Sequence, residues 1–303
     1  MRILPPPSDL KLILLHIWPA IIFRKTRSRF KDNLRKISVQ QRRFEMSSGT
    51  LSNRIDPWAF IRVKDERPTL LASLNSILPV IHKGVIAYND CTDGSDMIIK
   101  QFCRDHPEFI PFHYPYYVEP AGSKKYQTGE LKEENTVAGY YNAALNLIPK
   151  NEWLIKIDAD QIYFPEILEH SFYLPKSTKD VVSYSRLNLV RDGDNNLRVE
   201  DYLRPGDHWL VFNDNIHFIN IHGYSKEGKF YSYELVQWNK NKIPFKPECS
   251  SVHFPFEKNQ RKFKGNPEEL VLLDDFLAIA DKDEFSNEII KIKEIVASLF
   301  LKE

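Results

Sequence analysis

The stretch Trp153-Leu-Ile-Lys-Ile-Asp-Ala-Asp160 combines a short apolar strand with two carboxylates at its end. Residues i and i+2 of an extended chain point to the same side, so Asp158 and Asp160 are predicted to converge on one hard cation. Mg²⁺ and Mn²⁺ prefer oxygen ligands, and Mg²⁺ usually binds through one or two carboxylates and the phosphates of a substrate. The stretch predicts a cation held against a diphosphate, with two solvated carboxylates at a strand end as the alternative.

The chain before this stretch alternates between apolar strands and amphipathic helices. Strands are expected at 59–63, 84–88, 110–114 and 152–157, and helices at 69–81, 136–147 and from the turn at 89–95 to Phe102. This order predicts an α/β fold of Rossmann-like type, with a mostly parallel central sheet flanked by helices. Ligands of such sheets bind beyond the carboxyl ends of the strands, which is where the polar clusters of this sequence lie.

The sequence beyond Asp160 has weaker signals. Residues 180–185 resemble a strand, and the polar segment 191–198 is typical of a hairpin loop or surface excursion. Two amphipathic C-terminal helices are expected within 267–303, packing on the sheet or, alternatively, forming a membrane or dimer surface. The expected organisation is a membrane-associating segment (1–50), a catalytic domain (51–260) and a C-terminal helical tail (261–303).

The composition is that of an ordinary globular protein. Of 303 residues, 42% are hydrophobic and 27% charged, and the net charge is +1, so no general attraction to polyanions such as nucleic acid is expected. The three cysteines have no CxxC spacing, which argues against a structural zinc and favours a reducing compartment such as the cytoplasm.

The N-terminal region joins a short apolar patch to a basic run. Residues 10–23 are mostly apolar, and residues 24–43 carry nine Lys or Arg against the single Asp32. The patch is shorter than the roughly 20 apolar residues that span a bilayer. Its charges follow the apolar stretch, unlike those of a secretory signal. Peripheral attachment to the anionic cytoplasmic leaflet is expected, with a packed N-terminal helix as the alternative.

Four segments of the sequence stand out as motifs: Asp56-Pro-Trp-Ala-Phe-Ile-Arg-Val-Lys64, Gly84-Val-Ile-Ala-Tyr-Asn-Asp-Cys-Thr-Asp-Gly-Ser95, Glu152-Trp-Leu-Ile-Lys-Ile-Asp-Ala-Asp160 and Val252-His-Phe-Pro-Phe256. Together they resemble the bacterial lipooligosaccharide β-1,4-N-acetylgalactosaminyltransferases. The resemblance implies a GT-A fold and an inverting enzyme that uses UDP-GalNAc with Mn²⁺ or Mg²⁺. It also implies β-1,4 transfer to a galactose or sialyl-galactose of a lipid-linked lipooligosaccharide acceptor, and the N-terminal patch is expected to keep the enzyme near that acceptor at the inner face of the bacterial inner membrane.

The same resemblance assigns nucleotide-binding roles near the ends of the first two strands. Arg62, Lys64 and Glu66 lie where the corresponding segment of GT-A enzymes runs under the uridine, and Arg62 or Lys64 could bind phosphate oxygens of the donor. A solvated charged loop is the alternative. Asp90 matches the position of a carboxylate that accepts the uracil N3–H. Asp93 is included in the nucleotide site, although an Asp-Gly pair also shapes turns and caps helices without any ligand.

The resemblance places His253 with Asp158 and Asp160 as a third metal ligand. Imidazole suits Mn²⁺, but a histidine among apolar residues is also a common core group. Asp158 and Asp160 would hold the cation between the two phosphates, so that it neutralises the charge developing on the departing UDP.

Inversion in one displacement requires a base opposite the leaving group. Asp207, in a Pro-Gly-Asp that matches the family, is the first candidate, with Glu248 second and Glu234 third. Trp209 and Trp238 are candidate sugar-stacking rings, with core packing as the alternative.

Several alternative functions remain, because residues 187–241, which should help to select the acceptor, match the family poorly. A β-galactosyl- or N-acetylglucosaminyltransferase has the same chemistry, since small pocket changes exchange these donors. A non-catalytic scaffold of a glycan-assembly complex is the alternative from another class. A nucleotidyltransferase also places carboxylates on a metal, but the sequence has no Gly-rich phosphate loop near its N-terminus.

Overall fold

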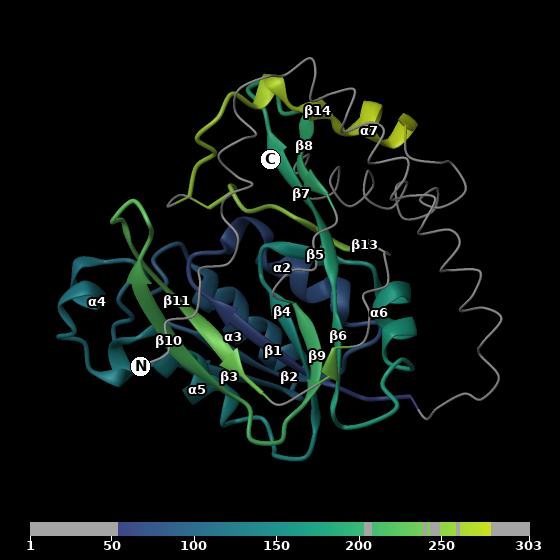
Figure 1. The fold of residues 1–303 in the computed structure, drawn as a ribbon. Helices are drawn as coiled ribbons and strands as arrows, with labels where there is room; N and C mark the ends of the chain where they lie inside the picture. The colour runs from purple at the N-terminus through teal and green to yellow at the C-terminus, as the bar shows by residue number, and fades with distance from the viewer. Residues whose placement is uncertain (1–53, 203–207, 239–240, 243–248, 259–260, 280–303) are drawn as a thin grey trace.

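The computed structural model describes residues 54–202, 208–238, 241–242, 249–258 and 261–279 (Figure 1). The first half contains β1 (Trp58–Val63), α2 (Arg67–Ile77), β2 (Lys83–Tyr88), α3 (Ser95–Asp105), β3 (Phe109–His113), α4 (Lys124–Thr128), η3 (Glu133–Asn135), α5 (Val137–Leu145), β4 (Trp153–Asp158), β5 (Gln161–Tyr163) and α6 (Pro165–Ser171). The second half contains β6 (Asp180–Ser183), β7 (Ser185–Arg191), β8 (Leu197–Tyr202), β9 (Trp209–Phe212), β10 (His217–Tyr224), β11 (Phe230–Gln237), β12 (Asn241–Lys242), β13 (Cys249–His253), η4 (Pro267–Glu269), β14 (Val271–Leu272) and α7 (Leu273–Ile279).

The central sheet has seven strands in the order β12-β6-β9-β4-β1-β2-β3. β1 pairs in parallel with β2 and β4, and β2 pairs in parallel with β3. β9 runs antiparallel to its neighbours β4 and β6. The chain therefore has an α/β fold with a mixed, largely parallel sheet, as the alternation of strands and helices predicted. The four strands predicted before Asp160 are confirmed, with ends that differ by one residue.

The central strands are buried on both faces, which explains why they read as nearly continuous apolar runs. Ile61 of β1 belongs to the core shared with α2 and α3, whereas Phe60 belongs to the core shared with α5 and β10. Leu70 and Leu74 of α2 are fully buried, but Leu71 is half exposed, so the apolar face of that helix is narrower than the leucine spacing indicated.

A second sheet of five strands, in the order β14-β8-β7-β13-β5, lies against the carboxyl end of the first (Figure 1). β13 pairs in parallel with β7 and antiparallel with β5. The predicted hairpin loop at 191–198 is confirmed, because β7 and β8 form an antiparallel pair around it. Two residues separate the end of β4 from the start of β5, so the chain passes from one sheet to the other at Ala159 and Asp160.

The two ends of the chain are described only in part. Within the described C-terminal residues, α7 is the one α-helix, so the two predicted helices of 267–303 are not both seen, and 280–303 lie outside the described residues. The apolar and basic N-terminal segments also lie outside them. None of the described helices is long and apolar enough to cross a membrane.

Candidate active site

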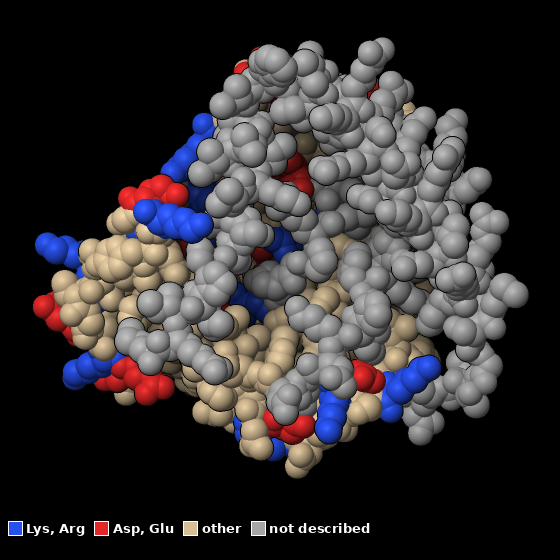
Figure 2. Space-filling view, viewed as in Figure 1, with Lys and Arg blue, Asp and Glu red and all other residues tan. Residues whose placement is uncertain are grey.

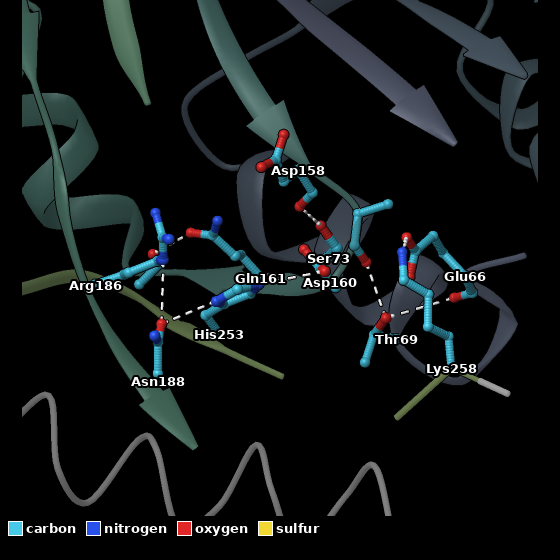
Figure 3. Close-up of polar contacts among 12 residues, drawn as sticks. Glu66, Thr69, Ser73, Asp158, Asp160, Gln161, Arg186, Asn188, His253 and Lys258 are labelled. Atoms are coloured by element: carbon cyan, nitrogen blue, oxygen red, sulfur yellow. Dashed lines mark hydrogen bonds and ion pairs between the residues drawn. The ribbon is translucent and has the colours of Figure 1, made fainter. Parts of the chain in front are cut away.

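The junction between β4 and β5 positions the two aspartates, Asp158 and Asp160. Asp158 is the last residue of β4, and Asp160 lies in the turn before β5, so they do not share one face of an extended strand as predicted. The turn is fixed by α2, because Ser73 Oγ donates to the carbonyl of Asp158 at 3.1 Å and Thr69 Oγ1 donates to that of Ala159 at 3.0 Å. The two carboxylates point in different directions (Figure 3).

Asp158 is surrounded by nitrogen donors. Its carboxylate contacts Arg62 Nη2 at 2.6 Å, Lys156 Nζ at 3.2 Å and His208 Nε2 at 2.7 Å. Burial favours the neutral acid, but the charges of Lys156, His208 and Arg62 outweigh burial and hold the pKa of Asp158 well below its usual range. The Arg62 guanidinium stacks on the Tyr141 ring at 4.2 Å. The Arg62 side chain is therefore buried against Asp158, and it does not belong to a solvated charged loop.

Asp160 has a different partner, His253, which β13 delivers opposite Gln161. His253 Nε2 lies 3.2 Å from Asp160 Oδ2, and both side chains are about nine-tenths buried. Burial raises the pKa of Asp160, but hydrogen bonding to His253 and its charge outweigh burial and lower that pKa. The other ring nitrogen, Nδ1, contacts Asn188 Oδ1 at 2.9 Å (Figure 3). His253 is therefore buried beside Asp160 with polar contacts at both ring nitrogens, and its role as a metal ligand stays a prediction.

Glu66 lies at the edge of the same centre, paired with the ammonium group of Lys258 (Figure 3). Burial and the nearby charge of Asp160 raise its pKa to about 7, although Lys258 acts in the opposite direction. Glu66 can therefore change its protonation state near neutral pH, in a region already crowded with carboxylates.

The residues predicted to bind the nucleotide divide into two groups. Lys64 Nζ lies 3.7 Å from Asp90 Oδ2, and both side chains are more than 40% exposed, at the ends of β1 and β2. Asp93 instead accepts hydrogen bonds from the backbone nitrogens of Ser95 at 2.9 Å and of Arg67 at 2.9 Å. Asp93 therefore connects the starts of α2 and α3, as its Asp-Gly turn signal indicated.

The candidate bases are only partly described. Asp207 and Glu248 lie outside the described residues. Glu234 lies on β11, opposite Asn220 of β10. Trp209 is buried in the core, and its ring packs edge-on against Trp238 at 5.2 Å, so the packing alternative is confirmed for Trp209.

Sequence reasoning missed most of the polar residues around the aspartates. Lys156 had a usable signal, since it precedes Asp158 by two residues on the same strand face. Arg186, Asn188, His208 and Lys258 had none, because they come from distant segments that only the second sheet and its neighbours bring together.

The arrangement fits a divalent cation in part. Across the described residues, no three His, Cys, Asp or Glu side chains are grouped so that they could hold a metal, so Asp158, Asp160 and His253 are not assembled as one set. Asp160 and His253 do fit as neighbouring ligands, since cis ligands about 2.1 Å from an octahedral ion are about 3.0 Å apart. Acidic and basic side chains are recessed in the middle of this face, in the region of β4 and β5 (Figure 2).

A family model described as Beta-1,4-N-acetylgalactosaminyltransferase (CgtA) matches residues 41–301. No curated protein matches the chain. The inositol-1-phosphate CTP transferase from T. maritima aligns at 11% identity and a TM-score of 0.31, over 52% of this chain and 71% of that one. HddC from Yersinia pseudotuberculosis aligns at 12% identity and a TM-score of 0.24, over 65% of this chain and 89% of that one. These two scores are too low to support an argument.

Proposed function

Because the chain belongs to the β-1,4-N-acetylgalactosaminyltransferase family, we propose that it transfers N-acetylgalactosamine from UDP-GalNAc to a lipooligosaccharide acceptor. The family match over residues 41–301 is the observation that carries this proposal. The acceptor would be a galactose or sialyl-galactose, joined in β-1,4 linkage with inversion. The fold would be of the GT-A type, and the largely parallel sheet with polar side chains beyond its carboxyl edge supports a nucleotide site there.

The described residues near the proposed donor site have different roles. Lys64 and Asp90, exposed at the ends of neighbouring parallel strands, are proposed to meet the diphosphate and the uracil N3–H. Arg62 is proposed to act indirectly, because its guanidinium is engaged with Asp158. Asp93 supports the loop that carries Asp90, through its bonds to Ser95 and Arg67.

A Mn²⁺ or Mg²⁺ ion is proposed to be held by Asp160 and His253, with donor phosphates completing its ligands. When bound, the ion would neutralise charge on the departing diphosphate. Asp158, already bonded to three nitrogens, supplies fixed negative charge beside this pair. Asp207 or Glu248 is proposed to accept the proton of the acceptor hydroxyl as that oxygen bonds to the anomeric carbon and UDP leaves.

The N-terminal segment is proposed to keep the enzyme at the inner face of the bacterial inner membrane. Support comes from its sequence, where nine basic residues follow an apolar patch. Sedimentation with anionic vesicles, compared with neutral ones, tests the attachment. Equal recovery of the chain with both kinds of vesicle would contradict it.

The activity is tested on the full chain with UDP-GalNAc, UDP-GlcNAc and UDP-Gal and a sialyl-galactose acceptor. We expect transfer from UDP-GalNAc, a β-1,4 linkage in the product by NMR, and loss of turnover on chelation that Mn²⁺ restores. Faster transfer from UDP-Gal or UDP-GlcNAc than from UDP-GalNAc would contradict the proposed donor and favour a galactosyl- or N-acetylglucosaminyltransferase. UDP binding without transfer from any of these donors would favour the scaffold.

A further inference from the structure

The parallel strands β1 and β2 end in the same way. Their last paired residues are Val63 and Tyr88, and an aspartate stands two positions beyond each of them, Asp65 after β1 and Asp90 after β2. Both aspartates have a positive φ, 54° at Asp65 and 43° at Asp90, which residues other than glycine seldom adopt. The two strands therefore leave the sheet at matching positions, each through a backbone conformation that its surroundings must hold in place.

The two aspartates have different surroundings. Asp65 is 4% exposed, whereas the side chain of Asp90 is 42% exposed. Asp65 Oδ1 accepts two hydrogen bonds from Thr92, one from its backbone nitrogen at 2.6 Å and one from its hydroxyl at 3.1 Å. Asp65 thus binds the loop that follows β2, while Asp90, two residues before Thr92, lies at the surface beside Lys64.

Asp65 contacts this loop at a second point, close to Asp90. Its backbone nitrogen donates a hydrogen bond to the sulfur of Cys91, the residue that follows Asp90. Asp93, by contrast, acts at the far end of the loop, where it accepts from the backbone nitrogen of Ser95. Asp65 therefore fixes the part of the loop next to Asp90, and Asp93 fixes the part that begins α3.

We propose that Asp65 is a positioning residue for the nucleotide of the donor. By holding Thr92, it keeps the left-handed backbone at Asp90, so that the Asp90 carboxylate and the Lys64 ammonium stay side by side at the edge of the sheet. Without this contact, Asp90 would relax toward an ordinary φ and its carboxylate would turn away. A ligand binds more weakly in proportion as the competent conformation is less populated. The inference deepens the proposed function and rests on it for the identity of the ligand.

Two substitutions at position 65 separate the hydrogen bonds from the backbone conformation. Asp65→Gly allows the same φ but removes the acceptor, whereas Asp65→Asn keeps an acceptor oxygen on a residue that also tolerates this φ. UDP in the presence of Mn²⁺ is the probe, titrated into the full chain by calorimetry. We expect the Kd for UDP to rise about tenfold in the glycine variant and to stay within about threefold of the parent in the asparagine variant. Parent affinity in the glycine variant would overturn the inference.

The cysteines show whether the loop itself is released. Cys91 is half-buried, whereas Cys103 and Cys249 are buried. Alkylation followed by peptide mass spectrometry therefore distinguishes local release from general unfolding. In the glycine variant we expect Cys91 to react at least about tenfold faster, with the other two at their parent rates. Faster reaction of all three, or an unchanged rate at Cys91, would overturn the local role of Asp65.

Initial rates give a third readout, which a loss of stability alone would not produce. Weaker positioning of the nucleotide should raise the KM for UDP-GalNAc about tenfold in the glycine variant and leave kcat within about threefold of the parent. The asparagine variant should restore the parent KM. A lower kcat with an unchanged KM would overturn the inference.

A variant on the other side of the contact covers the case in which the glycine variant does not fold, as judged by circular dichroism. Thr92→Val removes the hydroxyl donor but keeps the backbone nitrogen and the side-chain shape. We expect it to weaken UDP binding about threefold and to speed the reaction of Cys91. Parent values for both would overturn the role of Asp65.

The outcomes separate this inference from the proposed function. A parent that binds UDP but transfers no GalNAc would contradict the proposed function alone, because binding and alkylation still decide the role of Asp65. A parent that does not bind UDP would overturn both. GalNAc transfer with parent UDP affinity in Asp65→Gly would overturn only the inference.

Discussion

Arg62 and Asp158 are direct partners across the parallel strands β1 and β4, and their side chains meet at 2.6 Å. The Arg62 side chain is 6% exposed and is stacked against Tyr141, so the guanidinium has little freedom to leave. The pair brings a charge-assisted bond to the carboxyl edge of the sheet before any ligand arrives. Asp158 is therefore held in place by its neighbouring strand β1 in the folded protein.

Replacing Asp158 by Asn should destabilise the protein strongly. The change leaves Arg62, Lys156 and His208 around a neutral amide, and removing one partner of a buried ionic cluster costs about 3–5 kcal/mol. Urea unfolding of parent and variant measures the difference. Asp96→Asn, which removes an exposed pair with Lys100 on α3, is the control and should change stability little. Equal effects of the two substitutions would contradict the structural role of Asp158.

Replacing Asp160 by Asn, or His253 by Gln, should reduce transfer more than stability. Loss of a cation that stabilises several kcal/mol of developing charge lowers kcat/KM by at least about two orders of magnitude. Initial rates at saturating Mn²⁺ measure this. Asp105→Asn on the exposed side of α3 serves as the control and should keep the parent's rate. Full activity in both site variants would contradict the proposal that Asp160 and His253 hold a cation.

The stability of the protein should depend on the pH through Glu66. Its pKa is about 7 in the folded chain against 4.5 unperturbed, chiefly because of burial, so ionised Glu66 disfavours the folded state. The parent should lose stability relative to Glu66→Gln as the pH rises from about 4.5 through 7. The pKa difference is 7 minus 4.5, or 2.5. Above pH 7 it corresponds to a loss of about 3 kcal/mol from the free energy of unfolding of the parent.

Unfolding at a series of pH values tests this dependence, and Glu169→Gln gives a control of opposite sign. Hydrogen bonding to Arg54 lowers the pKa of Glu169. Ionised Glu169 therefore stabilises the folded chain above its unperturbed pKa, and this stabilisation is lost as the pH falls. Parallel curves for the parent and Glu66→Gln would show that Glu66 is not perturbed by folding.

Replacing Gly84 by Ala should destabilise the pairing of β1 and β2. A Cβ there would lie 2.8 Å from both the Cβ and the carbonyl oxygen of Ala59, and relieving such overpacking costs about 1–3 kcal/mol. Gly193→Ala is the matched control, because a Cβ at Gly193 meets nothing within 4 Å. Thermal unfolding of both variants checks the prediction, and a Gly84 variant as stable as the control would contradict it.

The sequence predicted the parts of the fold that depend on local patterns. The strands ending at Val63, Tyr88 and Asp158 follow from apolar runs, and the capping role of Asp93 follows from its turn signal. The geometry of Asp160 was predicted wrongly, because strand periodicity assumes an extended chain and the backbone turns at that residue.

The remaining polar residues of the site depend on pairings that no local pattern contains. His253 reaches Asp160 because β13 pairs with β5, and Arg186 is carried on β7, the other neighbour of β13. Such registers are set by packing between segments about 65–90 residues apart, as the bonds of Asn188 with His253 and of Gln161 with Ser251 show. A single sequence does not show which histidine meets which aspartate.

The two-residue step from β4 to β5 places the two aspartates beside different sheets, so substitutions in one sheet affect one aspartate more than the other. Asp158 belongs to the first sheet through β1, whereas the surroundings of Asp160 come largely from the second. Changes in β7 or β13 would therefore alter the surroundings of Asp160 and His253 while the pairing of β1 with β4 around Asp158 stays the same.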